Sequence, residues 1–254
     1  MPFCVIKSRT IKFFVLIMSV ALLLCISFEG FTSASVWFGH SSRLVPIYNV
    51  DTSEAKVAIS FDAAWGADDT KNIIEILKEY NVSATFFLVG FWVDKYPEMV
   101  KYIDESGFEI GTHSNTHPDM AKLDGQEMKN ELSLSMEKIK KITGKDVKLF
   151  RAPYGSYNNT LIEVASELGL KVIQWDVDSL DWKDISAAQV TDRVMKKTKN
   201  GSIILMHNSA KHVTDNLRLS LDWLKMKGYT VTNVGNLVYE NNYTIDANGV
   251  QHKS

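Results

Sequence analysis

Two histidines, four residues apart, are the first side chains in this chain that could do chemistry together. His113 and His117 lie in the segment 111–118, Gly-Thr-His-Ser-Asn-Thr-His-Pro, directly after the strand-like run 108–110. Side chains at positions i and i+4 share one face of a helix, so two imidazoles at this spacing can bind one divalent cation. The pair predicts a metal site, and two solvated turn histidines beside a proline are the alternative.

Other polar side chains follow the remaining predicted strands at the equivalent place. Because the carboxyl ends of parallel strands converge on one face of an α/β fold, we expect these side chains to be neighbours. A single residue of this kind is more often a helix cap or a loop charge, but five clusters at equivalent positions favour one shared site. The clusters are Asp62, the pair His113 and His117, Arg151, the pair Asp178 and Asp181, and His207.

The elements that must position these residues alternate between strand and helix. Apolar runs predict strands at 56–61, 84–89, 109–112, 148–150, 171–175, 202–206 and 229–232. Apolar residues at helical spacing predict helices at 70–80, 97–106, 125–142, 159–168, 186–197 and 217–227. Strands joined by crossover helices are parallel, in an open sheet or a barrel. The number of units favours an α/β barrel of about seven strands.

The N-terminus has the pattern of an export signal. Lys7, Arg9 and Lys12 precede an uncharged apolar stretch at 13–28, and small residues that can form a cleavage site follow it. Residues 1–35 are therefore predicted to be a signal or anchor leader. We favour retention as a membrane anchor, with the rest of the chain outside the cytoplasm, over cleavage and secretion.

Composition limits what the exported part can do. Both cysteines, Cys4 and Cys25, lie in the leader, so disulfides and thiolate chemistry are excluded beyond it. The formal net charge of -2, without a basic stripe, argues against a nucleic-acid partner. We interpret 36–51 as a linker, 52–240 as a single domain and 241–254 as a loose polar tail.

In their order along the chain, these clusters resemble the five motifs of the polysaccharide deacetylases with a NodB homology domain, a group like carbohydrate esterase family 4. The resemblance covers about 57–238 and implies a distorted (β/α) barrel. The run Phe-Asp-Ala-Ala-Trp-Gly at 61–66 and the leader are similar to the sporulation-associated peptidoglycan deacetylase-like proteins of spore-forming bacteria. The motifs are Ser-Phe-Asp at 60–62, the histidine segment at 113–118, Arg-Ala-Pro-Tyr-Gly at 151–155, Asp-Ser-Leu-Asp-Trp at 178–182 and Leu-Met-His at 205–207.

The resemblance implies metal-assisted removal of acetyl groups from an N-acetylated glycan outside the cytoplasm. A divalent cation, zinc or cobalt, would be held by His113 and His117, polarise the amide carbonyl and make water nucleophilic. Asp62 would be the general base. Arg151 would pair with Asp62 and keep it ionised, since an arginine neighbour lowers a carboxyl pKa.

The leaving nitrogen needs an acid, and by resemblance this is His207. A carboxylate partner would raise the pKa of its imidazole, and Asp181 is the first candidate for this partner and Asp178 the second. The residues expected to contact the acetyl group are Tyr154, through its backbone N–H, and Trp182 and Leu205 as walls of the pocket. Plain core packing is the alternative for Trp182.

One position departs from the family pattern, in which two adjacent aspartates supply the base and a metal ligand. Here Asp62 is followed by Ala63, so the usual third protein ligand is missing. Asp68 or Asp69 from the loop, or Asp62 itself, could supply an oxygen, but we favour Asp69 and Thr70 as a helix cap. The sequence therefore predicts a weakly metallated, altered or impaired site.

Three functions fit this sequence. The leading interpretation is a deacetylase of N-acetylated cell-wall polysaccharide, tethered to the membrane through the leader. A membrane-tethered protein that binds or assembles glycan, with an impaired site, is the second, motivated by Ala63. An esterase of O-acetylated polysaccharide is the third, because the same residues would serve it.

Overall fold

The computed structural model describes residues 16–19, 43–183 and 185–254. Residues 43–254 form one compact unit. Apart from a helical turn at 16–19, the predicted leader at 1–35 lies outside the described residues. Among the described residues, no helix is both long enough and apolar enough to cross a membrane.

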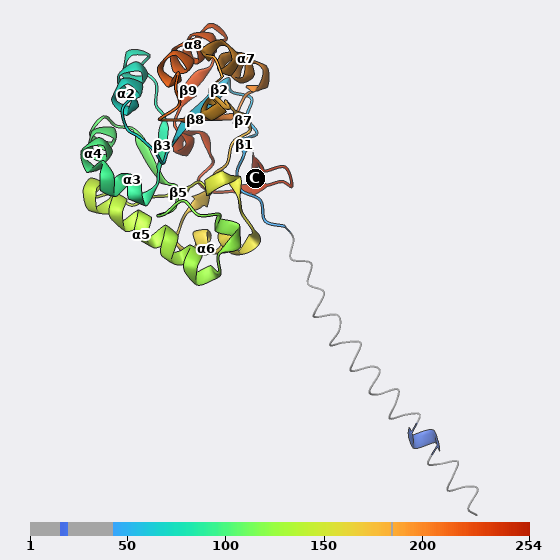
Figure 1. Cartoon of the computed structure of the whole chain (residues 1–254). Coiled ribbons are helices and arrows are strands. Elements are labelled where there is room, and N and C mark those ends of the chain that lie inside the picture. The colour runs from blue at the N-terminus through green and yellow to red at the C-terminus, as the bar shows by residue number, and fades with distance from the viewer. Residues whose placement is uncertain (1–15, 20–42, 184) are drawn as a thin grey trace, which may run out of the picture. The chain divides into compact units, whose positions relative to one another are not determined.

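Parallel strands form the centre of the larger unit and confirm the predicted α/β architecture. In the described part of the chain, seven strands curl into a half-barrel in the order β6-β5-β4-β3-β2-β8-β7, and β9 pairs with the start of β2 (Figure 1). The strands are β2 Lys56–Ala63, β3 Thr85–Leu88, β4 Glu109–Thr112, β5 Leu149–Phe150, β6 Lys171–Val172, β7 Val177–Asp178, β8 Ile203–His207 and β9 Thr230–Thr232.

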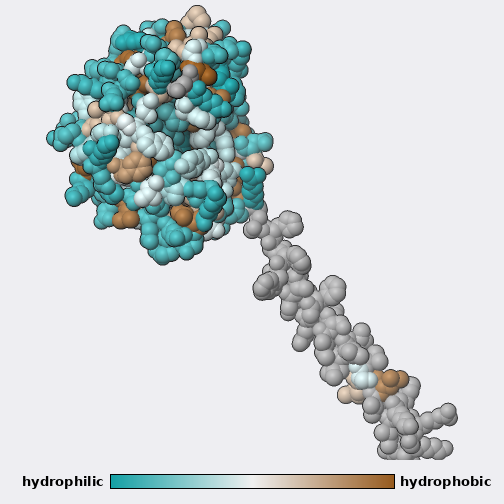
Figure 2. All heavy atoms as spheres, in the orientation of Figure 1, coloured by the Kyte–Doolittle hydropathy of each residue, from teal (hydrophilic) through white to brown (hydrophobic). Residues whose placement is uncertain are grey.

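Helices cover the outside of the strands (Figure 1). Their outer surfaces are mostly hydrophilic, with hydrophobic side chains scattered singly over the face in Figure 2, as expected for amphipathic helices. The sequence missed α3, and it placed the start of α8 too late because buried Asn216 interrupts the apolar pattern. The helices are α2 Thr70–Glu79, α3 Gly90–Lys95, α4 Pro97–Glu105, α5 Gly125–Thr143, α6 Asn159–Glu167, α7 Ala187–Lys197, α8 Val213–Met226 and α9 Val234–Leu237.

The central strands are buried on both faces, which is why they read as continuous apolar runs. The rings of Phe61 on β2 and Phe86 on β3 stack with centroids 5.1 Å apart. Helix α5 has a capping box at Asp124 and Glu127, and it ends at Gly144 in the left-handed conformation. These signals fix the ends of the helix that lies beside the histidine segment.

The predicted loose tail at 241–254 is wrong, and part of the predicted linker is structured with it. Strands β10 (Tyr243–Ile245) and β11 (Val250–Lys253) pair antiparallel, and β11 pairs parallel with β1 (Asn49–Val50). The C-terminus therefore lies beside β1 (Figure 1). The polar composition was misleading because Gln251 is fully buried and exchanges two hydrogen bonds with the backbone of Tyr239.

We expect Gly201→Ala to destabilise the fold strongly, because a Cβ there would lie 1.8 Å from the carbonyl oxygen of Val50. Gly201 also has φ +78°, which costs an L-residue about 1 to 2 kcal/mol. Overpacking against β1 should add about 1 to 3 kcal/mol. Urea unfolding of the purified full-length chain measures the loss.

Gly107→Ala is the matched control, because Gly107 has φ +79° and, apart from Gly107 and its two chain neighbours, no described residue has an atom within 4 Å of the position of the new Cβ. It should show only the conformational cost. Equal losses in the two variants would mean that crowding the new Cβ against Val50 carries no cost.

Candidate active site

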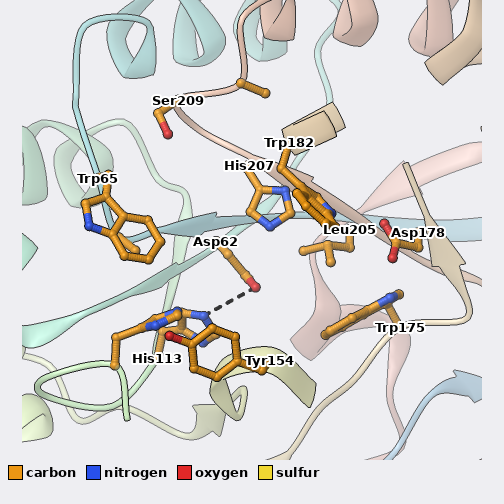
Figure 3. Close-up of a pocket in the computed structure, with 13 residues that line it drawn as sticks. Asp62, Trp65, His113, Tyr154, Trp175, Asp178, Trp182, Leu205, His207 and Ser209 are labelled. Carbon is orange, nitrogen blue, oxygen red and sulfur yellow. Dashed lines mark ion pairs between the residues drawn. The ribbon is translucent and has the colours of Figure 1, made fainter. Parts of the chain in front are cut away.

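A cleft of about 540 Å³ lies at the carboxyl ends of the strands. Figure 3 shows Asp62 and His207 near its centre, with Trp65 on one side and Trp175, Asp178 and Trp182 on the other. The strand register explains the central pair, since Asp62 of β2 lies opposite His207 of β8. The cleft is lined by Asp62, Ala64, Trp65, His113, His117, Tyr154, Trp175, Asp178, Trp182, Leu205, His207, Ser209 and Ala210.

Asp62 is held by a buried arginine. Arg151 Nη1 donates to Asp62 Oδ1 at 2.7 Å, and Nη2 donates to Ser60 Oγ at 2.8 Å. The guanidinium is 0% exposed and lies 4.2 Å from the ring centroid of Phe87. Burial, the largest single influence, acts to raise the pKa of Asp62, but the charges of Arg151, His113 and His207 and the hydrogen bond from Arg151 together lower the pKa below its ordinary value. Asp62 is therefore an ionised carboxylate at neutral pH.

The histidine segment is a loop, and the helical geometry assumed for it is wrong. Its backbone leaves β4 and turns back with φ +69° at Ser114 and φ +60° at His117, and Ser114 Oγ accepts the N–H of His117 at 3.0 Å. The rings of His113 and His117 nevertheless meet, with centroids 5.0 Å apart. The i, i+4 spacing correctly predicted that the two rings are neighbours. A turn with positive φ angles, and not one face of a helix, brings them together.

The donor atoms of these histidines can be assigned from their partners. His113 Nδ1 lies 2.8 Å from the carbonyl oxygen of Arg151, which can only accept, so Nδ1 carries the hydrogen. Nε2 then has a lone pair and faces Asp62 Oδ2 at 3.5 Å. Nδ1 of His117 is buried without a hydrogen-bond partner among the described residues. Burial lowers the pKa of His113, and it lowers the pKa of His117 to about 4, so both rings are neutral.

Two neutral imidazoles with free lone pairs beside an ionised carboxylate fit a divalent cation. The fit is incomplete, because the described residues contain no group of three or more His, Cys, Asp or Glu side chains able to hold a metal as they stand. Ala63 is fully buried in the core. Asp68 and Asp69 do not line the cleft. Asp69 is the N-cap residue of α2, without a side-chain cap hydrogen bond.

His207 has the carboxylate partner that the sequence favoured. Its Nδ1 lies 2.7 Å from Asp181 Oδ1, and its backbone N–H donates to Asp181 Oδ2 at 2.9 Å. Burial acts to lower the pKa of His207, but the hydrogen bond and charge of Asp181 raise it above the ordinary value. Asp178 instead accepts the N–H of Leu180 at 2.9 Å and lines the cleft.

Exposed aromatic rings form the rim of the cleft. Trp182 is 57% exposed and Tyr154 is 69% exposed. The alternative prediction for Trp182, plain packing in the core, is therefore wrong. Leu205 is almost fully buried and lines the wall. Sequence reasoning missed Trp65, which is 62% exposed and lies edge-on to His117. The signal that could have found Trp65 is its place in the run 61–66, three residues after Asp62.

Sequence comparisons place these features in a known context. A family model described as polysaccharide deacetylase matches residues 49–173. The chain is 36% identical over 157 residues to the peptidoglycan-N-acetylglucosamine deacetylase of Bacillus cereus, covering 62% of this chain and 57% of that enzyme. It spans 61%, 57% and 42% of the length of three curated relatives that it matches.

Solved structures extend the comparison. A CE4 family pseudoenzyme from Bacillus anthracis has a TM-score of 0.75 and 33% identity, covering 83% of this chain and 73% of that one. A mutant of that pseudoenzyme, described as having restored enzymatic activity, has a TM-score of 0.74 and 36% identity, covering 76% and 71%. Proteins of similar fold and sequence thus include both enzymes and a pseudoenzyme.

We expect Asp181→Asn to lower the pKa of His207, because the substitution removes the charge that raises it. Asp178→Asn, the matched control, should lower it less, since Asp178 makes no hydrogen bond to the ring and its charge has a smaller effect on the pKa than that of Asp181. An NMR titration of the histidine rings in the metal-free chain measures both changes, with His252 as internal reference. A larger change in Asp178→Asn would contradict the assignment of Asp181 as the partner.

Proposed function

Because the chain belongs to the polysaccharide deacetylase family, we propose that it hydrolyses N-acetyl groups on a peptidoglycan-like or chitin-like glycan. The observation that carries this proposal is the pairing of Asp62 and His207 on adjacent strands beside one cleft. Their pKa values are displaced in opposite directions, so one is an ionised base while the other retains a proton as an acid. Amide hydrolysis needs both groups.

The proposed reaction begins when a water oxygen attacks the carbonyl carbon of the N-acetyl group. Asp62 takes the proton that the water loses, and Oδ2 is the oxygen for this step because Oδ1 is bonded to Arg151. Attack converts the carbonyl oxygen to an oxyanion. The backbone N–H of Tyr154, which lines the cleft, is the proposed donor to that oxyanion.

His207 completes the reaction by giving a proton to the leaving nitrogen as the C–N bond breaks. The products are acetate and a free amine on the sugar. Asp181 holds both the ring Nδ1 and the backbone N–H of His207, which fixes the ring and leaves Nε2 for the substrate. The same contact stabilises the protonated ring before the transfer.

The proposed cation, zinc or cobalt, would be held by His113 and His117, with Asp62 Oδ2 as the facing carboxylate oxygen. When bound, such a cation supplies positive charge that polarises a carbonyl and acidifies water. The neutral state of both rings favours binding, because an imidazolium cannot ligate.

The rim of the cleft suits a sugar chain. Trp182, Tyr154 and Trp65 present exposed rings, which can pack against the apolar faces of sugars. Leu205 offers a buried apolar wall for an acetyl methyl group. The predicted leader at 1–35 supports export with retention at the membrane, and the resemblance at 61–66 supports a role in sporulation.

Acetate release tests the proposal. The purified full-length chain, supplied with zinc or cobalt, should release acetate from N-acetylglucosamine oligosaccharides or peptidoglycan. His207→Ala should lower kcat by about 10²- to 10⁴-fold, the usual contribution of a general acid. Trp223→Phe on the outer helix α8 is a control that should leave the rate unchanged. No release with any metal would overturn the proposal, and release from O-acetylated xylan alone would replace it with an esterase.

A glycan-binding protein without turnover is the second candidate, and Ala63 is the observation that favours it. The buried methyl group of Ala63 offers no ligand at the place where the family motif has its second aspartate. Asp62 then faces the histidines as the one adjacent carboxylate among the described residues. It cannot act freely as a base while it serves as a metal ligand. The pseudoenzyme of similar fold is a precedent.

We expect Ala63→Asp to increase zinc affinity and acetate release together, because it restores the carboxylate that the family motif has at this position and would free Asp62 for catalysis. Calorimetric zinc titration and an acetate assay measure the two effects. Ala64→Asp is the charge-matched control. It adds the same charge to the cleft at the neighbouring position, and it should not produce the same joint increase. Tighter zinc binding by Ala63→Asp without any gain in acetate release would contradict the idea that the missing ligand limits turnover.

A further inference from the structure

We propose that Glu131 is a positioning residue that sets how His113 and His117 present their rings to a shared cation. Glu131 lies on α5 and does not line the cleft. It would act on the reaction only through the loop that connects the two histidines. The inference rests on the proposed metal-binding role of that pair.

A single carboxylate satisfies three donors of this loop. Glu131 Oε2 accepts the backbone N–H groups of Asn115 and Thr116, each at 2.8 Å. Its Oε1 accepts the hydroxyl of Thr116, also at 2.8 Å. All three donors belong to the residues between Ser114 and His117. Hydrogen bonds to an ionised acceptor are stronger than neutral ones, so Glu131 fixes the loop where it turns.

The loop needs an external anchor because its own conformation is unfavourable. Ser114 and His117 both have positive φ angles, which L-residues rarely adopt, and such conformations persist only when surrounding contacts enforce them. Regular pairing of β4 with β3 ends at Thr112. Beyond Thr112, two backbone N–H groups at the start of α3 donate to the loop. Gly90 N–H donates to the carbonyl oxygen of Ser114 at 2.9 Å, and Phe91 N–H donates to the carbonyl oxygen of Asn115 at 3.1 Å.

These contacts hold the loop from opposite sides. The first backbone N–H groups of α3 donate to carbonyl oxygens of the loop, and Glu131 accepts from N–H groups of the loop. Lys138 adds a second anchor from α5, since its Nζ donates to Asn115 Oδ1 at 2.7 Å and to Asp94 Oδ2 at 2.6 Å. Residues 131 and 138 are seven apart, so they share one face of the helix. That face is built to hold the loop.

The geometry of the histidine pair therefore depends on α5. If Glu131 is removed, the N–H groups of Asn115 and Thr116 lose their acceptor, and the segment that leads into His117 loses an anchor. The His113 ring is held separately by the carbonyl oxygen of Arg151. Loss of Glu131 should consequently move His117 relative to His113 and weaken a cation shared by both, without displacing Asp62 or His207.

Glu131→Gln tests this proposal with little change in shape. Its amide offers one acceptor oxygen in place of two and turns an NH₂ group toward the loop donors. We expect Co²⁺ affinity to fall about 10-fold, the lower end of the effect of losing a group bonded to a metal ligand, because Glu131 contacts the loop and not the histidine rings. The d–d absorption band of bound Co²⁺ should also change. The full-length chain is titrated with Co²⁺ by absorption and calorimetry, and thermal unfolding is followed without metal.

Glu137→Gln on the same helix is the matched control, because Glu137 is exposed. It should leave Co²⁺ affinity and spectrum unchanged. Thr116→Val removes only the hydroxyl bond and should shift affinity in the same direction by a smaller factor. This second variant keeps the test valid if Glu131→Gln unfolds. Wild-type affinity and an unchanged spectrum in both variants would overturn the proposal.

A metal-free readout separates this inference from the proposed function. The ring resonances of His117 should move in Glu131→Gln more than those of His113, and neither should move in Glu137→Gln. If the wild-type chain binds no metal but this pattern appears, the metal hypothesis fails and the positioning role stands. If ring resonances in Glu131→Gln match the wild type, the positioning role fails whatever the outcome of the acetate assay.

Discussion

The buried ion pair between Arg151 and Asp62 is the interaction on which the rest of the site depends. A guanidinium with no exposed surface is stable only when a carboxylate and further acceptors surround it, because an unpaired buried charge is very costly. Asp62 and Ser60 from β2 supply those acceptors across the sheet from β5. The backbone of Arg151 also accepts from His113. Arg151 therefore fixes the carboxylate of Asp62, the proposed base, and its carbonyl oxygen fixes the tautomer of His113, a candidate metal ligand.

The second constraint is strand register. Asp62 and His207 are opposite each other on β2 and β8, so two groups with opposite pKa displacements are adjacent without any loop to hold them. Arg151 lowers the pKa on one side of this pair, and Asp181 raises it on the other. A slip of one residue would turn either side chain away from the cleft. The strands of the core, and not the loops of the rim, thus place the proposed acid and the proposed base.

The sequence could predict what depends on local pattern. Apolar runs located the strands, and polar residues at strand ends located Asp62, Arg151 and His207 as neighbours. It could not predict long-range pairing, such as that of β1 with β11, because a buried Gln251 looks like an exposed one in a polar tail. It also could not predict Glu131, since a helix glutamate carries no sign that the donors it binds lie in a distant loop.

Ala63 changes the balance of these interactions in a way that follows from the geometry. Asp62 has two oxygens, and Arg151 occupies one, so the other must serve both the histidines and any water that attacks the substrate. A carboxylate drawn to a cation becomes a weaker base, because positive charge stabilises its ionised form. In the proposed reaction, stronger metal binding through Asp62 would therefore lower the rate of proton removal from water. A cation bound by these histidines would therefore set metal affinity against base strength at a single oxygen atom, Oδ2 of Asp62.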